Sequence, residues 1–244
     1  MRTKTALFAL LSLVVLLTFS ACGQKTAPTS ETEPAGMPPV ADSGPASAPA
    51  AAPEASLRGV KLVEVLAPKN FRDVEFETPY DVLSKAGALI TVVSTKKGEC
   101  VGADGLKVQA VATPKEIKVA DYEGVLFIGG PGMMDYVSDA SFIALAKAFA
   151  SADKLTAAIC VAPAILANAG LLGGKAATAF PDVLPTLKAK GALVVTADVA
   201  VAGKIITANG PPAAAHFAQA LLTALSAQPG KAPASQPMSA PAKP

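Results

Sequence analysis

Between Leu57 and Ser226, short apolar runs alternate with helix-like segments, and no other feature of the sequence limits the fold as much. An apolar run at 60–67 precedes a helical pattern at 71–87, and a second apolar run follows at 88–94. Strands that alternate with helices in this way are typical of parallel sheets. The pattern therefore predicts an α/β domain with a mostly parallel sheet, rather than an all-α or all-β fold.

The alternation continues through the rest of this region. Later apolar runs predict strands at 124–130, 155–160, 192–196 and 204–208, with 106–112 as an added strand or hairpin. Helices are expected at 141–150, 162–170, 182–189 and 211–225. Pro211 and Pro212 suit the first turn of the last helix, because their missing N–H groups would be unpaired there anyway.

The N-terminal end of the chain differs from the middle. Arg2 and Lys4 precede an apolar stretch at 6–17, which is typical of an export signal and too short to span a bilayer. The residues around Cys22 resemble the lipobox of bacterial lipoproteins, which implies removal of residues 1–21 and lipidation of Cys22. An ordinary secretory signal that is cut nearby is the alternative.

Two segments are rich in Pro, Ala and Ser and contain few large apolar side chains, at 22–56 and 227–244. Such segments cannot bury enough surface to fold, so we expect a tether and a disordered tail. Two or more acyl chains anchor a protein stably to a bilayer, so Cys22 predicts a lipid-anchored protein of the bacterial cell envelope. Gly23, rather than Asp, after this cysteine favours the outer membrane over the inner one.

Charge and motif content exclude several functions. The net charge is only +2, and no basic cluster or helix-turn-helix pattern indicates a nucleic-acid partner. No group of His, Cys and carboxylate residues has the spacing of a metal site. The turn at Gly129 and Gly130 lacks the Lys-Ser/Thr pair of a P-loop and the spacing of a dinucleotide fingerprint, so no cofactor is expected.

Cys160 ends an apolar strand and immediately precedes a helix. Its sulfur would face the helix N-terminus, whose unpaired N–H groups and dipole favour a thiolate. Corners of this kind carry nucleophiles on α/β sheets, and ligands bind such sheets at the carboxyl ends of their strands. The alternative is a small buried core residue, since free Cys is among the most buried residue types.

Glu75 falls on the stripe of the first helix that should face the sheet. The stripe has helical spacing and consists of Phe71, Glu75, Thr78 and Val82. Pro79 cannot donate a hydrogen bond to the Glu75 carbonyl, which predicts a distorted turn beside the carboxylate. The alternative is a rotated helix that leaves Glu75 in water.

Gly129 and Gly130 end a buried strand. A turn with so little side-chain bulk can aim backbone N–H groups at a developing oxyanion. A plain tight turn is the alternative.

Four stretches, in this order, resemble the DJ-1/PfpI superfamily, which has the class I glutamine amidotransferase-like fold: 70–87, 125–136, 157–181 and 209–222. The resemblance covers about residues 60–225 and implies a flavodoxin-like three-layer α/β/α sandwich. It also implies a reactive cysteine at Cys160, an acidic partner at Glu75, and an oxyanion site built from the N–H groups of Gly130 and Val161. Relatives are usually dimers, so a homodimer is expected.

The sequence departs from the pattern of the superfamily in its histidines. Relatives with peptidase-like activity have His where this chain has Val161, and others have His at the position of Phe180. The single histidine is His216, which lies among apolar residues and lacks an orienting carboxylate nearby in the sequence. A Cys-His-acid triad is therefore not expected, and neither is protease or amidotransferase activity.

A Cys–Glu dyad without histidine suits one mechanism. The Cys160 thiolate adds to an aldehyde, backbone N–H groups hold the oxyanion, and Glu75 moves the carbon-bound proton. The superfamily includes glyoxalase-like and deglycase-like enzymes, so a small reactive aldehyde is the expected substrate. A redox role, in which Cys160 is oxidised and hydrogen-bonded by Glu75, and a non-catalytic partner-binding role are the alternatives. Cys100, expected in a loop, is an unassigned free thiol.

Overall fold

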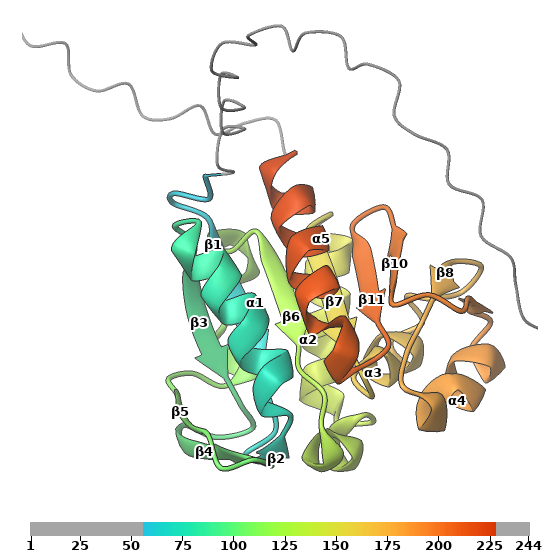
Figure 1. The fold of residues 1–244 in the computed structure, drawn as a ribbon, viewed down its shortest axis with the longest axis horizontal. Coiled ribbons are helices and arrows are strands. Elements are labelled where there is room, and N and C mark those ends of the chain that lie inside the picture. The colour runs from blue at the N-terminus through green and yellow to red at the C-terminus, as the bar shows by residue number, and fades with distance from the viewer. Residues whose placement is uncertain (1–55, 228–244) are drawn as a thin grey trace, which may run out of the picture. The chain divides into compact units, whose positions relative to one another are not determined.

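A six-stranded sheet forms the middle layer of the domain, which the computed structural model describes over residues 56–227. The strand order is β10-β11-β7-β6-β1-β3. These strands are β1 (Lys61–Val65), β3 (Leu89–Val93), β6 (Gly124–Phe127), β7 (Leu155–Ile159), β10 (Val199–Ala202) and β11 (Ile205–Ala208). Every neighbouring pair is parallel except β10 and β11 (Figure 1). The predicted α/β fold with a mostly parallel sheet is confirmed.

Helices cover both faces of the sheet. Helices α1 (Asp73–Lys85) and α5 (Ala214–Ser226) pack against each other on one face, and α2 (Ala140–Ser151) and α3 (Pro163–Asn168) lie on the other (Figure 1). A short helix, α4 (Leu184–Ala189), packs against a small parallel sheet of β8 (Ala176–Ala177) and β9 (Leu193–Val194). The layers are therefore those of the expected α/β/α sandwich.

Short 3₁₀ helices connect several of these elements. They are η1 (Pro114–Glu116), η2 (Val119–Asp121), η3 (Pro131–Tyr136), η4 (Pro181–Val183) and η5 (Pro211–Ala213). Four of the five, all but η2, begin with proline, whose fixed φ suits the first turn of a helix. Pro211 and Pro212 thus form the turn that leads into α5, as their position in the sequence suggests.

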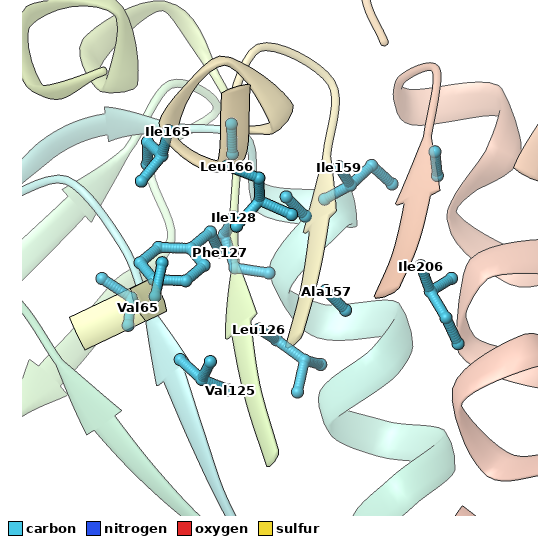
Figure 2. Close-up of a cluster of buried hydrophobic side chains, with 14 of the residues drawn as sticks. Val65, Val125, Leu126, Phe127, Ile128, Ala157, Ile159, Ile165, Leu166 and Ile206 are labelled. Carbon is cyan, nitrogen blue, oxygen red and sulfur yellow. The ribbon is translucent and has the colours of Figure 1, made fainter. Parts of the chain in front are cut away.

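The core explains why the sequence shows continuous apolar runs. Strands β6 and β7 are buried at every residue, because helices cover both faces of a parallel sheet. Paired residues point to the same face, so Val65 and Phe127 lie on one side while Leu126 and Ala157 lie on the other (Figure 2). The two sets pack against different helix layers.

A second sheet lies beside the start of α1. It consists of β2 (Lys69–Phe71), β4 (Gly98–Gly102) and β5 (Lys107–Ala110), with β4 and β5 antiparallel. The buried carboxylate of Asp73 accepts backbone N–H groups from Asp104 at 2.9 Å and from Leu106 at 2.7 Å. These bonds attach the β4–β5 turn to the first residue of α1.

Some elements differ from the expectation. Strands β2, β4 and β10 are absent from the sequence-based prediction, because short strands that contain Gly, Lys or Ala carry little strand signal. Cys100 lies in β4 and is 1% exposed, so the expected loop position is wrong. The run at 192–196 yields only β9, which lies outside the main sheet.

Several predictions fall outside residues 56–227. They are the signal peptide at 1–21, lipidation at Cys22, nearly all of the tether that follows it, and nearly all of the C-terminal tail. Within the described range, no helix has the length and apolar character that crossing a bilayer requires.

Candidate functional site

Cys160 lies in the turn between β7 and α3, at the carboxyl end of the central strands. Its backbone has φ +65°, a left-handed conformation that few residues other than glycine adopt. Two hydrogen bonds hold this turn: the Cys160 N–H donates to the Ala208 carbonyl at 2.9 Å, and the Cys160 carbonyl accepts the Phe180 N–H at 2.7 Å. Strain of this kind persists only where the surroundings fix it.

Glu75 points inward from the first turns of α1. The side chain is 0% exposed, so the alternative of a rotated helix with Glu75 in water does not hold. Pro79 lies inside α1, four residues later, and is also buried. Among the described residues, neither Glu75 carboxylate oxygen has a hydrogen-bond partner of ordinary geometry. A buried carboxyl without such a partner is costly, which makes it a candidate for chemistry.

Gly129 brings Cys160 and Glu75 together. A Cβ atom at this position would lie 2.5 Å from the Cys160 Cβ and 2.7 Å from the Glu75 Oε2. Both side chains therefore lie against the backbone of Gly129, and only glycine leaves enough space for them. The sequence marks Gly129 as part of a turn, but its role as a spacer between two side chains is visible only in three dimensions.

Gly130 lets a second backbone segment approach the site. Its φ is +109°, and a Cβ there would overlap the backbone nitrogen of Arg72 and lie 2.6 Å from the Phe71 carbonyl carbon. The Arg72 N–H donates to the Gly129 carbonyl at 3.1 Å. The glycine turn is thus locked against the segment that leads into α1, which positions Glu75.

The environment of Glu75 favours its protonated form. Burial raises the pKa of the Glu75 carboxyl from 4.5 to about 7, while the Cys160 thiol, the Arg72 guanidinium and the Gly129 backbone act in the opposite direction. Arg72 is not among the residues predicted for the site, although its position three residues before Glu75 places it one helical turn away.

The thiol of Cys160 is also disfavoured as an anion. Burial, followed by the charge of Glu75, raises the pKa of the Cys160 thiol from 9.0 to about 12. The expectation of a low thiol pKa is therefore wrong for the free protein. The side chain is only 5% exposed, and its loss of water outweighs the helix N-terminus.

The backbone N–H groups of Gly130 and Val161 both act on the Cys160 sulfur and lower its pKa. These are the two groups that the family resemblance implies for an oxyanion site. The structure thus gathers the four residues of the expected site at one place: Cys160, Glu75, Gly130 and Val161. Between the two raised pKa values the dyad carries a single proton, and the carboxylate is the form of Glu75 that accepts it from the thiol.

His216 lies outside this cluster. It is exposed in the first turn of α5, and its Nδ1 lies 3.1 Å from Oδ2 of Asp198. The expectation that His216 lacks an orienting carboxylate is therefore wrong, because the loop before β10 supplies one from 18 residues away. The groups that shift the pKa of Cys160 do not include His216.

Cys100 is the other cysteine among the described residues. Cys100 and Cys160 are both free and buried. Burial raises the pKa of the Cys100 thiol, so it is not activated. No group of three or more His, Cys, Asp or Glu residues within 56–227 has the geometry to hold a metal ion.

A buried cysteine on a left-handed strand-to-helix turn, with a buried acid and two backbone N–H groups beside it, defines a class of flavodoxin-like proteins with a cysteine elbow. The sequence pattern of the DJ-1/PfpI family matches residues 61–224. The chain belongs to this family.

Known relatives agree with this assignment. A protein of Methanocaldococcus jannaschii is 38% identical over 173 residues, which cover 70% of this chain and 84% of the relative. The crystal structure of a ThiJ/PfpI domain protein from Brachyspira murdochii has a TM-score of 0.69 at 27% identity, and the match covers 70% of this chain and 99% of that one. Oxidized DJ-1 from Toxoplasma gondii has a TM-score of 0.61 at 30% identity, with 68% and 90% covered.

Proposed function

We propose that this protein is an envelope-anchored enzyme that converts small 2-oxoaldehydes to 2-hydroxy acids through Cys160 and Glu75. The observation that carries the proposal is the meeting of a thiol and an unpaired buried carboxyl at the Gly129 backbone. Cys160 is only 5% exposed, which favours a substrate of a few atoms over a peptide. Attachment through a lipid on Cys22 and a homodimeric state are parts of the same proposal.

The first step forms a hemithioacetal. The sulfur of Cys160 bonds to the aldehyde carbon, the thiol proton passes to the Glu75 carboxylate, and the N–H groups of Gly130 and Val161 stabilise the aldehyde oxygen as it gains negative charge. The raised thiol pKa is no obstacle, because Glu75 removes the proton as the sulfur attacks.

The following steps move one proton between carbons. The protonated Glu75 returns its proton to the oxyanion, and its carboxylate then takes the hydrogen from the former aldehyde carbon to give an enediolate. The hydroxyl proton passes to the former ketone oxygen, and the Glu75 carboxyl protonates the carbon that carries this oxygen, which leaves a thioester on Cys160 and restores the carboxylate. Water hydrolyses the thioester to the 2-hydroxy acid and frees the thiol, so the net reaction adds one water to the substrate.

The test is methylglyoxal turnover by the full-length protein, with lactate as the product measured. Cys160→Ala and Glu75→Gln should each lower the rate by at least about 100-fold, because each removes a group that the mechanism needs. Cys100→Ala is the matched control, since it removes the other buried thiol of the domain and should leave the rate unchanged. Turnover that survives in Cys160→Ala would refute the proposal.

The rate should also depend on pH through Glu75. The carboxylate form accepts the thiol proton, so kcat/KM should rise with pH around the raised Glu75 pKa of about 7. A profile that rises near the ordinary carboxyl value of 4.5 would exclude Glu75 as the base.

A redox role is the second candidate, and one observation favours it. The two N–H groups directed at Cys160 and a protonated Glu75 are also the donors that a sulfinate would need. The structure of the Toxoplasma gondii relative is that of an oxidized protein, which supports redox chemistry in this fold. Peroxide treatment followed by mass analysis should then add two oxygens at Cys160 but not at Cys100, without aldehyde turnover.

A further inference from the structure

A hollow of about 330 Å³ lies at the opposite end of the sheet from Cys160. This is the amino end of the strands, where backbone hydrogen bonds connect the starts of β1, β6, β7 and β11. The Glu123 N–H donates to the Lys61 carbonyl, the Leu155 N–H to the Glu123 carbonyl, and the Thr156 N–H to the Lys204 carbonyl. The lining of the hollow includes Asp153, Lys154, Lys175 and Lys204. A five-residue strand separates it from Cys160 by about 17 Å, so it is not part of the site described above.

Three lysines line this hollow, and backbone carbonyls hold each ammonium group in place. Lys175 donates to the Leu171 carbonyl at 3.1 Å, and Lys154 donates to the carbonyls of Ala120 and Tyr122. Carbonyl partners orient an ammonium group without neutralising it. The side chains are therefore arranged before any ligand arrives, which lowers the entropy cost of binding.

The charge of the lining is unbalanced. Lys204 donates to the carbonyl and to Oδ2 of Asp153, at 2.5 and 2.6 Å, and Asp153 is the only acid in the lining. Lys154 and Lys175 have no acidic partner among the described residues. Three ammonium groups against one carboxylate leave two positive charges in excess, and each ammonium retains at least one N–H for a ligand.

An apolar groove of about 730 Å³ adjoins the hollow, and Lys204 lines both. The groove runs between α5 and the β10–β11 turn, and its lining includes Leu155, Val201, Ala220 and Ala224. Val201 is 58% exposed. A ligand with an anionic head and an apolar chain would find partners for both parts here.

We propose that the hollow binds a phosphate monoester in its dianionic form, with Lys154, Lys175 and Lys204 as its donors. Such a group carries a charge of about −1.5 to −2 near neutral pH and accepts several hydrogen bonds, which matches the excess charge and the free donors. The phosphate can belong to a soluble metabolite or to a lipid headgroup, and the adjoining groove gives the lipid an additional contact.

The experiment titrates the full-length protein with glycerol phosphate and with lysophosphatidic acid below its micelle concentration, followed by calorimetry. Lys154→Gln and Lys175→Gln should each weaken binding by about tenfold, because each removes one charge-assisted hydrogen bond. Lys188→Gln is the matched control, since it removes an exposed lysine of α4 that lies outside the hollow and has no ion-pair partner in the described part of the chain. It should leave affinity unchanged.

The outcomes separate the sources of the ligand. Equal affinity for the two probes indicates a soluble phosphate, whereas tighter binding of lysophosphatidic acid that Val201→Ser weakens indicates a lipid. Absence of binding by either probe overturns the proposal. So does a loss in Lys188→Gln as large as that in Lys175→Gln, because binding would then follow total charge rather than this hollow.

Discussion

The polar groups at the two ends of the central sheet differ in their exposure to water and in their hydrogen bonding. At the carboxyl end, Glu75 is fully buried and has no hydrogen bond of ordinary geometry within residues 56–227, and Cys160 has a strained backbone conformation. At the amino end, Lys154, Lys175 and Lys204 are partly or fully accessible, and each ammonium group has a carbonyl partner. Holding a carboxyl and a thiol out of water costs stability at the carboxyl end, whereas the lysines at the amino end stay solvated at little cost.

The largest expected effect comes from adding one methyl group at each end. Gly130→Ala should lower the free energy of unfolding by about 4 kcal/mol, because the new Cβ overlaps the Arg72 backbone at an unfavourable φ. Gly203→Ala, in the β10–β11 turn, has φ +63° but nothing within 4 Å of its new Cβ, and should cost only about 1 kcal/mol. Urea unfolding measures both. Equal losses would mean that the carboxyl end is not the more tightly packed one.

Titration of Glu75 should give the next largest effect. A folded-state pKa of about 7, above the ordinary 4.5, means that the folded protein binds more protons between these values than the unfolded chain. The free energy of unfolding therefore falls as the pH rises across this window, by up to about 3 kcal/mol.

Glu75→Gln should reduce this pH dependence to the part that another buried carboxyl, Glu64, contributes, whereas Glu77→Gln, at an exposed position of the same helix, should retain it in full. Urea unfolding at a series of pH values between 4.5 and 8 measures the slope. The same slope in both variants would show that Glu75 does not titrate as its burial requires.

A third buried carboxyl, in strand β1, extends the comparison to the interior of the sheet. Glu64 lies in β1 and is 0% exposed, and neither of its carboxylate oxygens has a hydrogen-bond partner within residues 56–227, so burial raises its pKa well above the usual range. The proposed chemistry does not use it. Glu64→Leu should raise the free energy of unfolding by about 2 kcal/mol and leave aldehyde turnover unchanged. A destabilised variant would indicate a polar partner for Glu64 in the folded protein.

The smallest effect is expected at the amino end. Lys204 and Asp153 form an ion pair at 2.6 Å between side chains that are 45% and 87% exposed. Lys204→Gln should change the free energy of unfolding by less than about 0.5 kcal/mol. A double-mutant cycle with Asp153→Asn measures the coupling, and a value of several kcal/mol would contradict the contrast between the two ends.

Much of the fold follows from the sequence, because buried parallel strands leave long apolar runs that are hard to mistake. The regions 124–127 and 155–159 are buried at every residue, and both were predictable from their composition alone. Strands β4 and β10 were not, since β4 begins and ends with glycine and half of β10 is alanine, residue types that carry little strand signal.

Some features of the candidate site could likewise be predicted from the sequence, and others could not. Helical phase placed Glu75 toward the sheet, and the strand-to-helix pattern placed Cys160 at a corner. The pKa of Cys160 could not be predicted, because it depends on how completely several segments exclude water from one sulfur atom. The pairing of His216 with Asp198 escaped notice for a related reason: the two residues approach only when β10 and α5 pack together.

The first and last of the described residues lie close to the ends of two helices that pack against each other. Leu57 donates its N–H to the carbonyl of Ala86, just beyond α1, and Ala227 follows directly after α5 (Figure 1). This arrangement makes the domain a good subject for circular permutation, with a short linker across these positions. It also allows the domain to be inserted into a surface loop of a host protein, with the cysteine elbow facing away from the junction.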